Sequence, residues 1–273
     1  MAHQTLILDS GAFSAWSRGA TIDIDEYMAF IVANADHIDY YINLDVIPGS
    51  FGVIPSPSEV EASAQASWDN MVYMERAGFQ PMPVFHMGEG FKWLRKMLDH
   101  GSPYVGISPA NDRPTAQKRM WLDRVFTEIA DSTGRPRIKT HALGVTAIPL
   151  LSRYPWFSAD SSAWTTATAR GVIYVPRLRP NGELDYGNSP LVIYMSGQRK
   201  LDGEDVRDYR TLHPHLRWHV DAYIKAAGTT VEEAKSSCVE RARICAFFFK
   251  QYEELFPHPE VFRAAKTPFF EDA

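Results

Sequence analysis

The chain alternates between short apolar runs and longer amphipathic stretches. The apolar runs are rich in β-branched and aromatic residues, a pattern that predicts buried strands. These runs fall at residues 5–8, 39–44, 82–85, 104–107, 137–140, 156–159, 172–175 and 191–194. Between them, apolar residues recur with the helical period, which predicts helices at about 25–35, 59–77, 91–99 and 115–131.

The helix predicted at 59–77 carries recognisable end signals. Ser58 and Glu61 have the spacing of a capping box, in which each side chain satisfies a free backbone amide of the first turn. Gly78 is placed to end the same helix, because glycine adopts the left-handed conformation that commonly follows a helix.

Strand and helix in repeated alternation predict a parallel sheet covered by helices. About eight strands favour closure into a TIM-like (β/α)8 barrel. A dinucleotide-binding fold would place a G-x-G-x-x-G turn after the first strand, and this chain has none there. From about residue 201 the pattern becomes helical, and 231–255 is its longest periodic stretch. We therefore predict one barrel domain over 1–273, with 201–273 as a helical closing or cap segment.

Composition narrows the class of protein. The 273 residues are 45% hydrophobic, which suffices for a large core. No apolar run approaches the roughly 20 residues of a membrane helix, and the first residues lack the basic region of a signal peptide. Cys238 and Cys245 lie on one predicted helix, too far apart along its axis for a disulfide. We expect a cytoplasmic protein with no membrane partner, no cofactor and no metal site.

The charges are distributed unevenly. The net charge of −5 by itself argues weakly against a nucleic-acid partner. Residues 1–60, however, hold one basic and eight acidic side chains, whereas 135–225 hold thirteen basic and eight acidic ones. This second region is compatible with phosphate contacts and equally with ordinary surface variation. Arg170, Arg177 and Arg179 are its candidates for phosphate contact.

Polar residues follow most of the predicted strands. Asp9, Asp45 and Asp160 each come directly after an apolar run, and active sites of parallel α/β folds lie beyond such strand ends. One such aspartate commonly caps a helix, but three at one barrel mouth repel one another, an arrangement typical of catalysis. The carboxylates suit either an Mg²⁺ site for phosphorylated substrates or glycosyl chemistry. The spacing leaves both open.

The polar segments also resemble a known family. The run Asp9-Ser10-Gly11-Ala12-Phe13 is similar to the D-[ST]-G-G-[FY]-Q segment of the tRNA-guanine transglycosylases. Further similarities follow in the family's order over about residues 6–171. They are Asp45 as the base-recognising aspartate, His86-Met87-Gly88-Glu89 as the V-Q-G turn, Gly106-Ile107-Ser108 as the glycine-rich run, Leu143-Gly144-Val145 as M-G-V-G, and Phe157-Ser158-Ala159-Asp160-Ser161 as F-D-C.

Three departures refine the resemblance. The glutamine of the V-Q-G turn is missing, the zinc motif C-x-C-x-x-C…H is absent, and the chain is shorter than the tRNA enzymes. The last two features resemble the phage-type, DpdA-like branch, which inserts 7-deazaguanines such as preQ0 into DNA. The resemblance therefore implies DNA as the polymer, with tRNA as the runner-up, and a bacterial host cytoplasm if the protein is phage-encoded.

The resemblance implies a role for each matching residue. Asp160 would be the covalent nucleophile, Asp9 the general acid and base, and Asp45 the acceptor for the donor edge of the purine. The other residues expected to bind the base are Phe13, His86, Gly88, Gly106, Ser108 and Gly144. Two further classes stay open at this point: a metal-dependent barrel hydrolase of small phosphorylated or glycosylated molecules, and a module that binds a modified base without turnover.

Overall fold

The computed structural model describes residues 5–50, 52–110, 112–197 and 206–264. These residues divide into two compact units. The first consists of the described parts of Met1–Leu143, Trp156–Ser158 and Arg263–Ala273, and the second of Gly144–Pro155 and Ala159–Phe262. The prediction of one domain over 1–273 is not tested by this division and stays a prediction.

The first unit is built on parallel strands. Strand β1 pairs with β2 in parallel, and β3, β4 and β5 also pair in parallel in chain order. A parallel bridge between Ile42 and Met82 joins the two groups. The strands are β1 (Ile7–Leu8), β2 (Tyr40–Tyr41), β3 (Val84–His86), β4 (Tyr104–Ser108) and β5 (Lys139–Ala142). A further short strand, β6 (Ser158–Ala159), begins in this unit and ends in the second. The predicted α/β class with a parallel sheet is confirmed.

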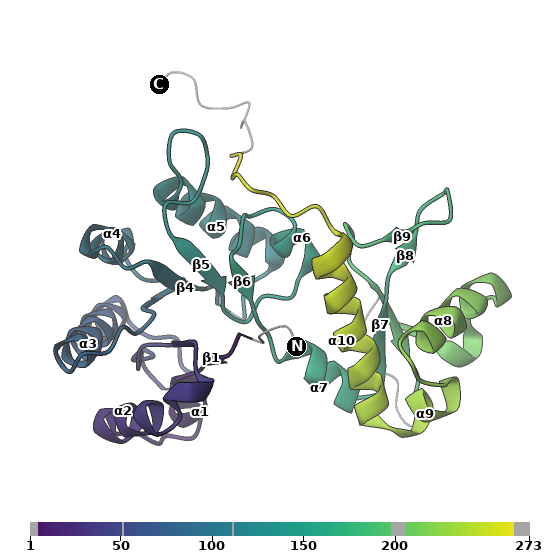
Figure 1. The fold of residues 1–273 in the computed structure, drawn as a ribbon, viewed down its shortest axis with the longest axis horizontal. Coiled ribbons are helices and arrows are strands. Elements are labelled where there is room, and N and C mark those ends of the chain that lie inside the picture. Colours follow the sequence, from purple (N-terminus) through teal and green to yellow (C-terminus); the bar gives the residue numbers. More distant parts are fainter. Residues whose placement is uncertain (1–4, 51, 111, 198–205, 265–273) are drawn as a thin grey trace. The chain divides into compact units, whose positions relative to one another are not determined.

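Along the chain, the helices of the first unit alternate with these strands (Figure 1). They are α1 (Ala12–Ser17), α2 (Ile24–Ala33), α3 (Pro57–Arg76), α4 (Phe91–His100) and α5 (Thr115–Ile129), with a short 3₁₀ helix at Ala35–His37. Each predicted helix of this unit is therefore present, with ends shifted by a few residues at most.

The capping box of α3 begins two residues earlier than predicted. Ser56, not Ser58, is the N-cap: its amide donates to Glu59 Oε2 at 2.7 Å, and its hydroxyl accepts from the Glu59 amide. Pro57 explains the shift, because its fixed φ suits the first helical position and its missing N–H is not needed there. Glu61 instead binds Lys92 and Trp93 of α4. The prediction for Gly78 is confirmed: it follows the C-cap with φ +91°.

Aromatic packing holds helices onto one face of the sheet. Phe85 of β3 is completely buried, stacks on Trp121 of α5 at 5.5 Å between ring centroids, and meets Phe91 of α4 edge-on. Val105 and Ile107 of β4 are also completely buried. Side chains alternate between the faces of a strand, so Tyr104, Gly106 and Ser108 face the opposite side.

The second unit has a different strand arrangement. Its three-stranded sheet has the order β11-β10-β7, and β8 with β9 forms a separate antiparallel hairpin. The predicted strands at 172–175 and 191–194 exist, but they pair with each other in antiparallel fashion, so they do not extend the parallel series. The strands are β7 (Val172–Val175), β8 (Arg177–Leu178), β9 (Leu184–Asp185), β10 (Leu191–Tyr194) and β11 (Val206–Asp208).

The predicted helical segment 201–273 is corrected at two points. Val206–Asp208 forms a strand parallel to β10, and residues 201–205 and 265–273 lie outside the described part. The periodic stretch 231–255 is two helices, because Ser237 has extended backbone and caps α10. The helices of this unit are α6 (Ile148–Leu151), α7 (Ala163–Ala169), α8 (Pro214–Ala226), α9 (Val231–Ser236) and α10 (Cys238–Leu255), with a 3₁₀ helix at Tyr209–Thr211.

The core of the second unit lies between the sheet and helices α8 and α10. Ile173, Ile193, Val220 and Ile244 are completely buried in one apolar cluster, and α10 runs along β7 (Figure 1). Cys245 is buried in this cluster whereas Cys238 is exposed, and both thiols are free, as predicted.

Gly171, just before β7, is expected to be intolerant of alanine. Its φ is +94°, and an added Cβ would lie 2.3 Å from Ser196 Oγ and 2.9 Å from Tyr194 Cε2. Backbone strain and overpacking together predict that Gly171→Ala lowers the free energy of unfolding by about 2 to 3 kcal/mol. Urea unfolding followed by circular dichroism measures this loss.

Gly182 supplies the matched control. Its φ of +86° is similar, but a Cβ there would meet nothing within 4 Å. Gly182→Ala should therefore cost only the backbone strain, about 1 kcal/mol. Equal losses in the two variants would contradict the steric argument at Gly171.

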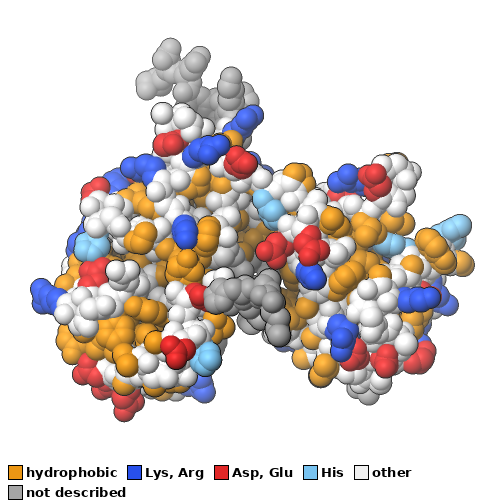
Figure 2. Space-filling model, viewed as in Figure 1, with side chains coloured by type: hydrophobic (Ala, Val, Ile, Leu, Met, Phe, Trp, Pro, Cys, Tyr) orange, Lys and Arg blue, Asp and Glu red, His pale blue; other side chains and the backbone are white. Residues whose placement is uncertain are grey.

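The surface mixes both signs of charge on each unit. Figure 2 shows a group of acidic side chains at the lower left of the first unit, Lys and Arg side chains elsewhere on it, and both acidic and basic side chains on the second unit. Within the described ranges, no helix combines the length and the apolar character needed to cross a membrane.

Candidate functional site

A polar cluster lies beyond the carboxyl ends of the first three strands. Asp9 follows β1, Asp45 follows the bridged segment after β2, and His86 is the last residue of β3. His86 Nε2 lies 3.0 Å from Asp45 Oδ2, and Ser10 Oγ donates to Asp45 Oδ1 at 3.2 Å. Neighbouring parallel strands end at one edge of a sheet, which explains why residues 35 or more positions apart meet here.

Glu89 completes this cluster, and the sequence reasoning did not single it out. His86 Nδ1 lies 3.1 Å from Glu89 Oε1, and the His86 amide donates to Glu89 Oε2 at 3.3 Å. The turn between them is closed by the Glu89 amide, which donates to the His86 carbonyl, and it includes Gly88 with φ +117°. The sequence pattern that could have identified Glu89 is its spacing of three residues from His86, with Gly88 between them.

The charges of the cluster are strongly coupled. Burial alone would lower the pKa of His86, but hydrogen bonds and charges from Asp45 and Glu89 outweigh it and raise the pKa to about 10. His86 is therefore an imidazolium at neutral pH, with its side chain 19% exposed. The stabilisation it gives the fold is complete below about pH 6.5 and is lost as the pH rises through about 10.

Asp9 and Asp45 both act on Tyr27 of α2. Burial, followed by the charges of these two carboxylates, raises the pKa of the Tyr27 phenol, whose hydroxyl donates to the Ile42 carbonyl at 2.7 Å. Both carboxylates therefore lie within electrostatic range of this phenol. Ser10, the residue after Asp9, donates to Asp45, so two of the three predicted aspartates belong to the same strand-end cluster of the first unit.

Three of the predicted base-binding residues differ in whether a ligand could contact them. Phe13 of α1 is 54% exposed, so its ring is accessible for stacking. Ser108 pairs with His86 across the β3–β4 register and lies beside the cluster. Gly106 is not a donor to a base: its amide donates to the Pro83 carbonyl at 2.8 Å, because it belongs to the sheet ladder.

The requirement for glycine at position 106 comes from packing. An added Cβ would lie 3.0 Å from Leu143 Cδ1 and 3.2 Å from Val84 Cγ2.

His141, which pairs with Gly106 across the β4–β5 register, belongs to a chain of polar contacts: Ser158 Oγ lies 2.5 Å from His141 Nδ1 and also contacts the Tyr104 hydroxyl. This polar chain links β4, β5 and β6, and it gives His141 a structural role at the end of β5.

Asp160 lies in the second unit, directly after β6. It is exposed, and its Oδ1 accepts a hydrogen bond from the Gly144 amide at 3.1 Å. Gly144 adopts φ +67°, which favours glycine at this position. The predicted nucleophile and the predicted base-binding glycine therefore contact each other, whereas Asp9 and Asp45 belong to the first unit.

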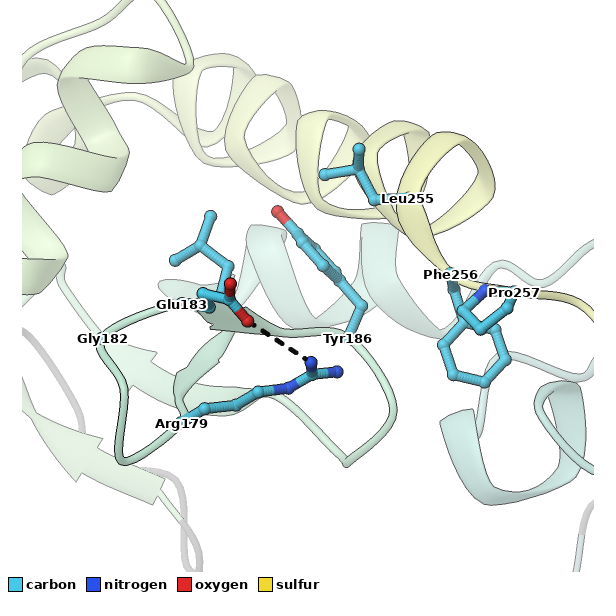
Figure 3. A pocket seen from close by; sticks show the side chains of 8 residues that line it. Arg179, Gly182, Glu183, Tyr186, Leu255, Phe256 and Pro257 are labelled. Carbon is cyan, nitrogen blue, oxygen red and sulfur yellow. Dashed lines mark ion pairs between the residues drawn. The ribbon is translucent and has the colours of Figure 1, made fainter.

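The predicted phosphate-contact arginines lie around α7 and the β8–β9 hairpin. Arg170 is the exposed C-cap of α7. Arg177 Nε donates to the Ser189 carbonyl at 2.8 Å. Arg179 is 3.7 Å from Glu183 and 3.8 Å from Asp185, and it lines a depression of about 410 Å³ with Tyr186 and the end of α10 (Figure 3). Arg179 thus already has acceptors within the hairpin, and Arg177 has one shortly after it.

The donor set of the cluster is unlike a metal site. Across the described residues, no group of three or more His, Cys, Asp or Glu side chains is arranged to hold a metal ion. Both ring nitrogens of His86 face carboxylates. The histidine therefore forms ion pairs and has no nitrogen lone pair left to bind a metal ion.

The fold and the site define an α/β protein whose parallel strand ends carry a carboxylate–imidazolium–carboxylate cluster. No family model matches the chain, and no curated protein matches its sequence.

Proposed function

We propose that this protein is a transglycosylase that replaces guanine in DNA with a 7-deazaguanine base such as preQ0. The observation that carries the proposal is the convergence of Asp9 and Asp45 at the ends of adjacent parallel strands, with Asp45 oriented by Ser10 and His86. Repelling carboxylates held together at a strand-end edge are typical of catalytic sites.

The proposed reaction has two steps. Asp160 attacks C1′ of a flipped-out deoxyguanosine, a bond forms between its carboxylate oxygen and C1′, and the C1′–N9 bond breaks. The electron pair moves to guanine, which Asp9 helps to protonate as it leaves. Asp9 then removes the N9 proton of the incoming base, which attacks C1′ and releases Asp160.

The fine architecture belongs to the same proposal. It includes the closed TIM-like (β/α)8 barrel predicted from the sequence, a fold whose active sites lie at the carboxyl ends of the strands. The carboxylate of Asp160 is exposed, and the hydrogen bond from the Gly144 amide at 3.1 Å orients it, which suits a nucleophile.

The direction of exchange follows from the chemistry of the base. Guanine carries a nitrogen at position 7 that accepts a proton when the glycosidic bond breaks. A 7-deazaguanine has carbon there, so the inserted base is a poor leaving group and the exchange is close to irreversible. DNA is preferred over tRNA because the sequence lacks the zinc motif of the tRNA enzymes. A host-DNA or phage-DNA substrate would place the reaction in a bacterial cytoplasm.

Polymer labelling tests the proposal. Purified protein is incubated with radiolabelled preQ0 and either duplex DNA or tRNA, with and without EDTA. We expect label in DNA, unaffected by EDTA. Label only in tRNA would favour the RNA enzyme, EDTA-sensitive turnover would favour a metal-dependent hydrolase, and absence of label in both polymers would overturn base exchange.

A further inference from the structure

His86 is held between two carboxylates that come from different segments. Asp45 follows β2 and contacts Nε2 at 3.0 Å, whereas Glu89 lies in the turn before α4 and contacts Nδ1 at 3.1 Å. The side chains of Asp45 and Glu89 are only 10% and 6% exposed. A shielded ion pair of this kind is screened little by salt, and it fixes the ring in one orientation.

The same contacts fix the carboxylate of Asp45. Its Oδ2 faces His86 and its Oδ1 accepts from Ser10. A carboxylate offers about four acceptor positions, two on each oxygen. One position on each oxygen therefore remains, and this pair matches a ligand with two adjacent N–H donors.

Glu89 has a role that Asp45 alone could not fill. Asp45 with His86 would form a neutral pair, and a second carboxylate keeps the imidazolium charged while the cluster as a whole stays negative. Besides burial, the charges of Asp9 and Asp45 and the neighbouring Tyr41 raise the pKa of the Tyr27 phenol, so the surroundings of Asp45 oppose a further negative charge. The cluster thus favours a ligand edge made of donors only.

We propose that His86 and Glu89 are positioning residues that orient Asp45 to bind two adjacent N–H donors of a 2-amino-6-oxopurine or its 7-deaza analogue. This inference rests on the proposed function for the identity of the ligand. Adenine presents a donor beside an acceptor on the corresponding edge, so the same carboxylate would reject it.

Nitrogen NMR of the histidine side chains tests the ion-pair arrangement without any substrate. The chain has nine histidines, and His86 is assigned by the signal that His86→Gln removes. We expect His86 to stay charged up to about pH 9 in the wild type, since its pKa lies near 10, and to lose its charge at lower pH in Glu89→Gln. Titration of His86 below pH 7 in the wild type would overturn the arrangement.

Calorimetric binding of preQ0, guanine and adenine tests the positioning role. His86→Ala should weaken preQ0 binding roughly ten-fold or more, since it removes a charge-assisted hydrogen bond that orients Asp45. His86→Gln should bind within about three-fold of the wild type, because its amide nitrogen can donate to Asp45. Glu89→Gln should fall between them, and adenine should bind to none of the variants.

His100→Gln is the matched control. His100 also pairs with a carboxylate, Glu75 at 2.9 Å, but on the helical surface. This variant should bind preQ0 as the wild type does. Equal preQ0 affinity in the wild type and His86→Ala would overturn the positioning role. Absence of preQ0 and guanine binding in a wild type whose His86 stays charged would overturn the ligand class and the proposed function, while the ion-pair arrangement would stand.

Discussion

Asp160→Asn is expected to abolish the covalent protein–DNA adduct and to slow base exchange by roughly 10³-fold or more. The amide is a poor nucleophile, so no bond to C1′ can form. Its side-chain oxygen can still accept the hydrogen bond that Gly144 donates at 3.1 Å, and the fold should therefore be preserved. Denaturing gel electrophoresis of protein incubated with end-labelled DNA measures the adduct.

Glu183→Gln provides the comparison for this substitution. Glu183 is an exposed carboxylate of the same unit, and its ion pair with Arg179 spans 3.7 Å. Removing this charge should leave adduct formation unchanged. Adduct that persists in Asp160→Asn would show that another side chain is the nucleophile, and an equal loss in both variants would point to a general effect of charge.

Arg241→Met is expected to lower the free energy of unfolding by about 3 to 4 kcal/mol. The Arg241 side chain is 5% exposed and donates to the Thr168 carbonyl at 2.7 Å, the Ala234 carbonyl at 2.9 Å and the Lys235 carbonyl at 3.2 Å. The Ala234 and Lys235 carbonyls lie in the last turn of α9, where helical partners are lacking, whereas the Thr168 carbonyl near the end of α7 also accepts from the Gly171 amide at 3.1 Å. Methionine fills the space of the Arg241 stem but removes the donor of the Ala234 and Lys235 carbonyls and one of the two donors of the Thr168 carbonyl.

Arg243→Met separates this effect from the loss of any arginine. Arg243 lies two residues further along α10, is exposed, and pairs with Glu240 at 2.9 Å. An exposed ion pair of this kind contributes at most about 1 kcal/mol. Urea unfolding of both variants, followed by tryptophan fluorescence, gives the comparison. Equal midpoints for Arg241→Met and the wild type would contradict the capping role of Arg241.

Much of the first unit could be predicted from the sequence. The apolar runs located β3 and β4 to within a residue or two, and the position of Asp45 and His86 just after such runs placed them at the edge of the sheet. These features depend on local alternation and on the rule that parallel strands share one carboxyl edge. Glu89 was missed because its role depends on a turn through Gly88 that brings its carboxylate back to His86.

The second unit was predicted less well for a different reason. The strands at 172–175 and 191–194 were located correctly, but an apolar run does not reveal the direction of its partner. A short strand at Val206–Asp208 lies where the pattern suggested helix, since its pairing with β10 outweighs local propensity. The break at Ser237 likewise depends on a cap that the periodicity of 231–255 conceals.

The elements of the first unit, the α/β class and the aspartates that follow the strands could be predicted from the sequence, because side-chain period and strand-end position are local properties. Three features come from the folded chain alone: His86 lies between Asp45 and Glu89, Gly106 serves packing, and Arg241 caps two helices. Each of these depends on which distant acceptor or side chain the fold brings within about 3 Å, and hydrogen bonds and ion pairs are decided at that range.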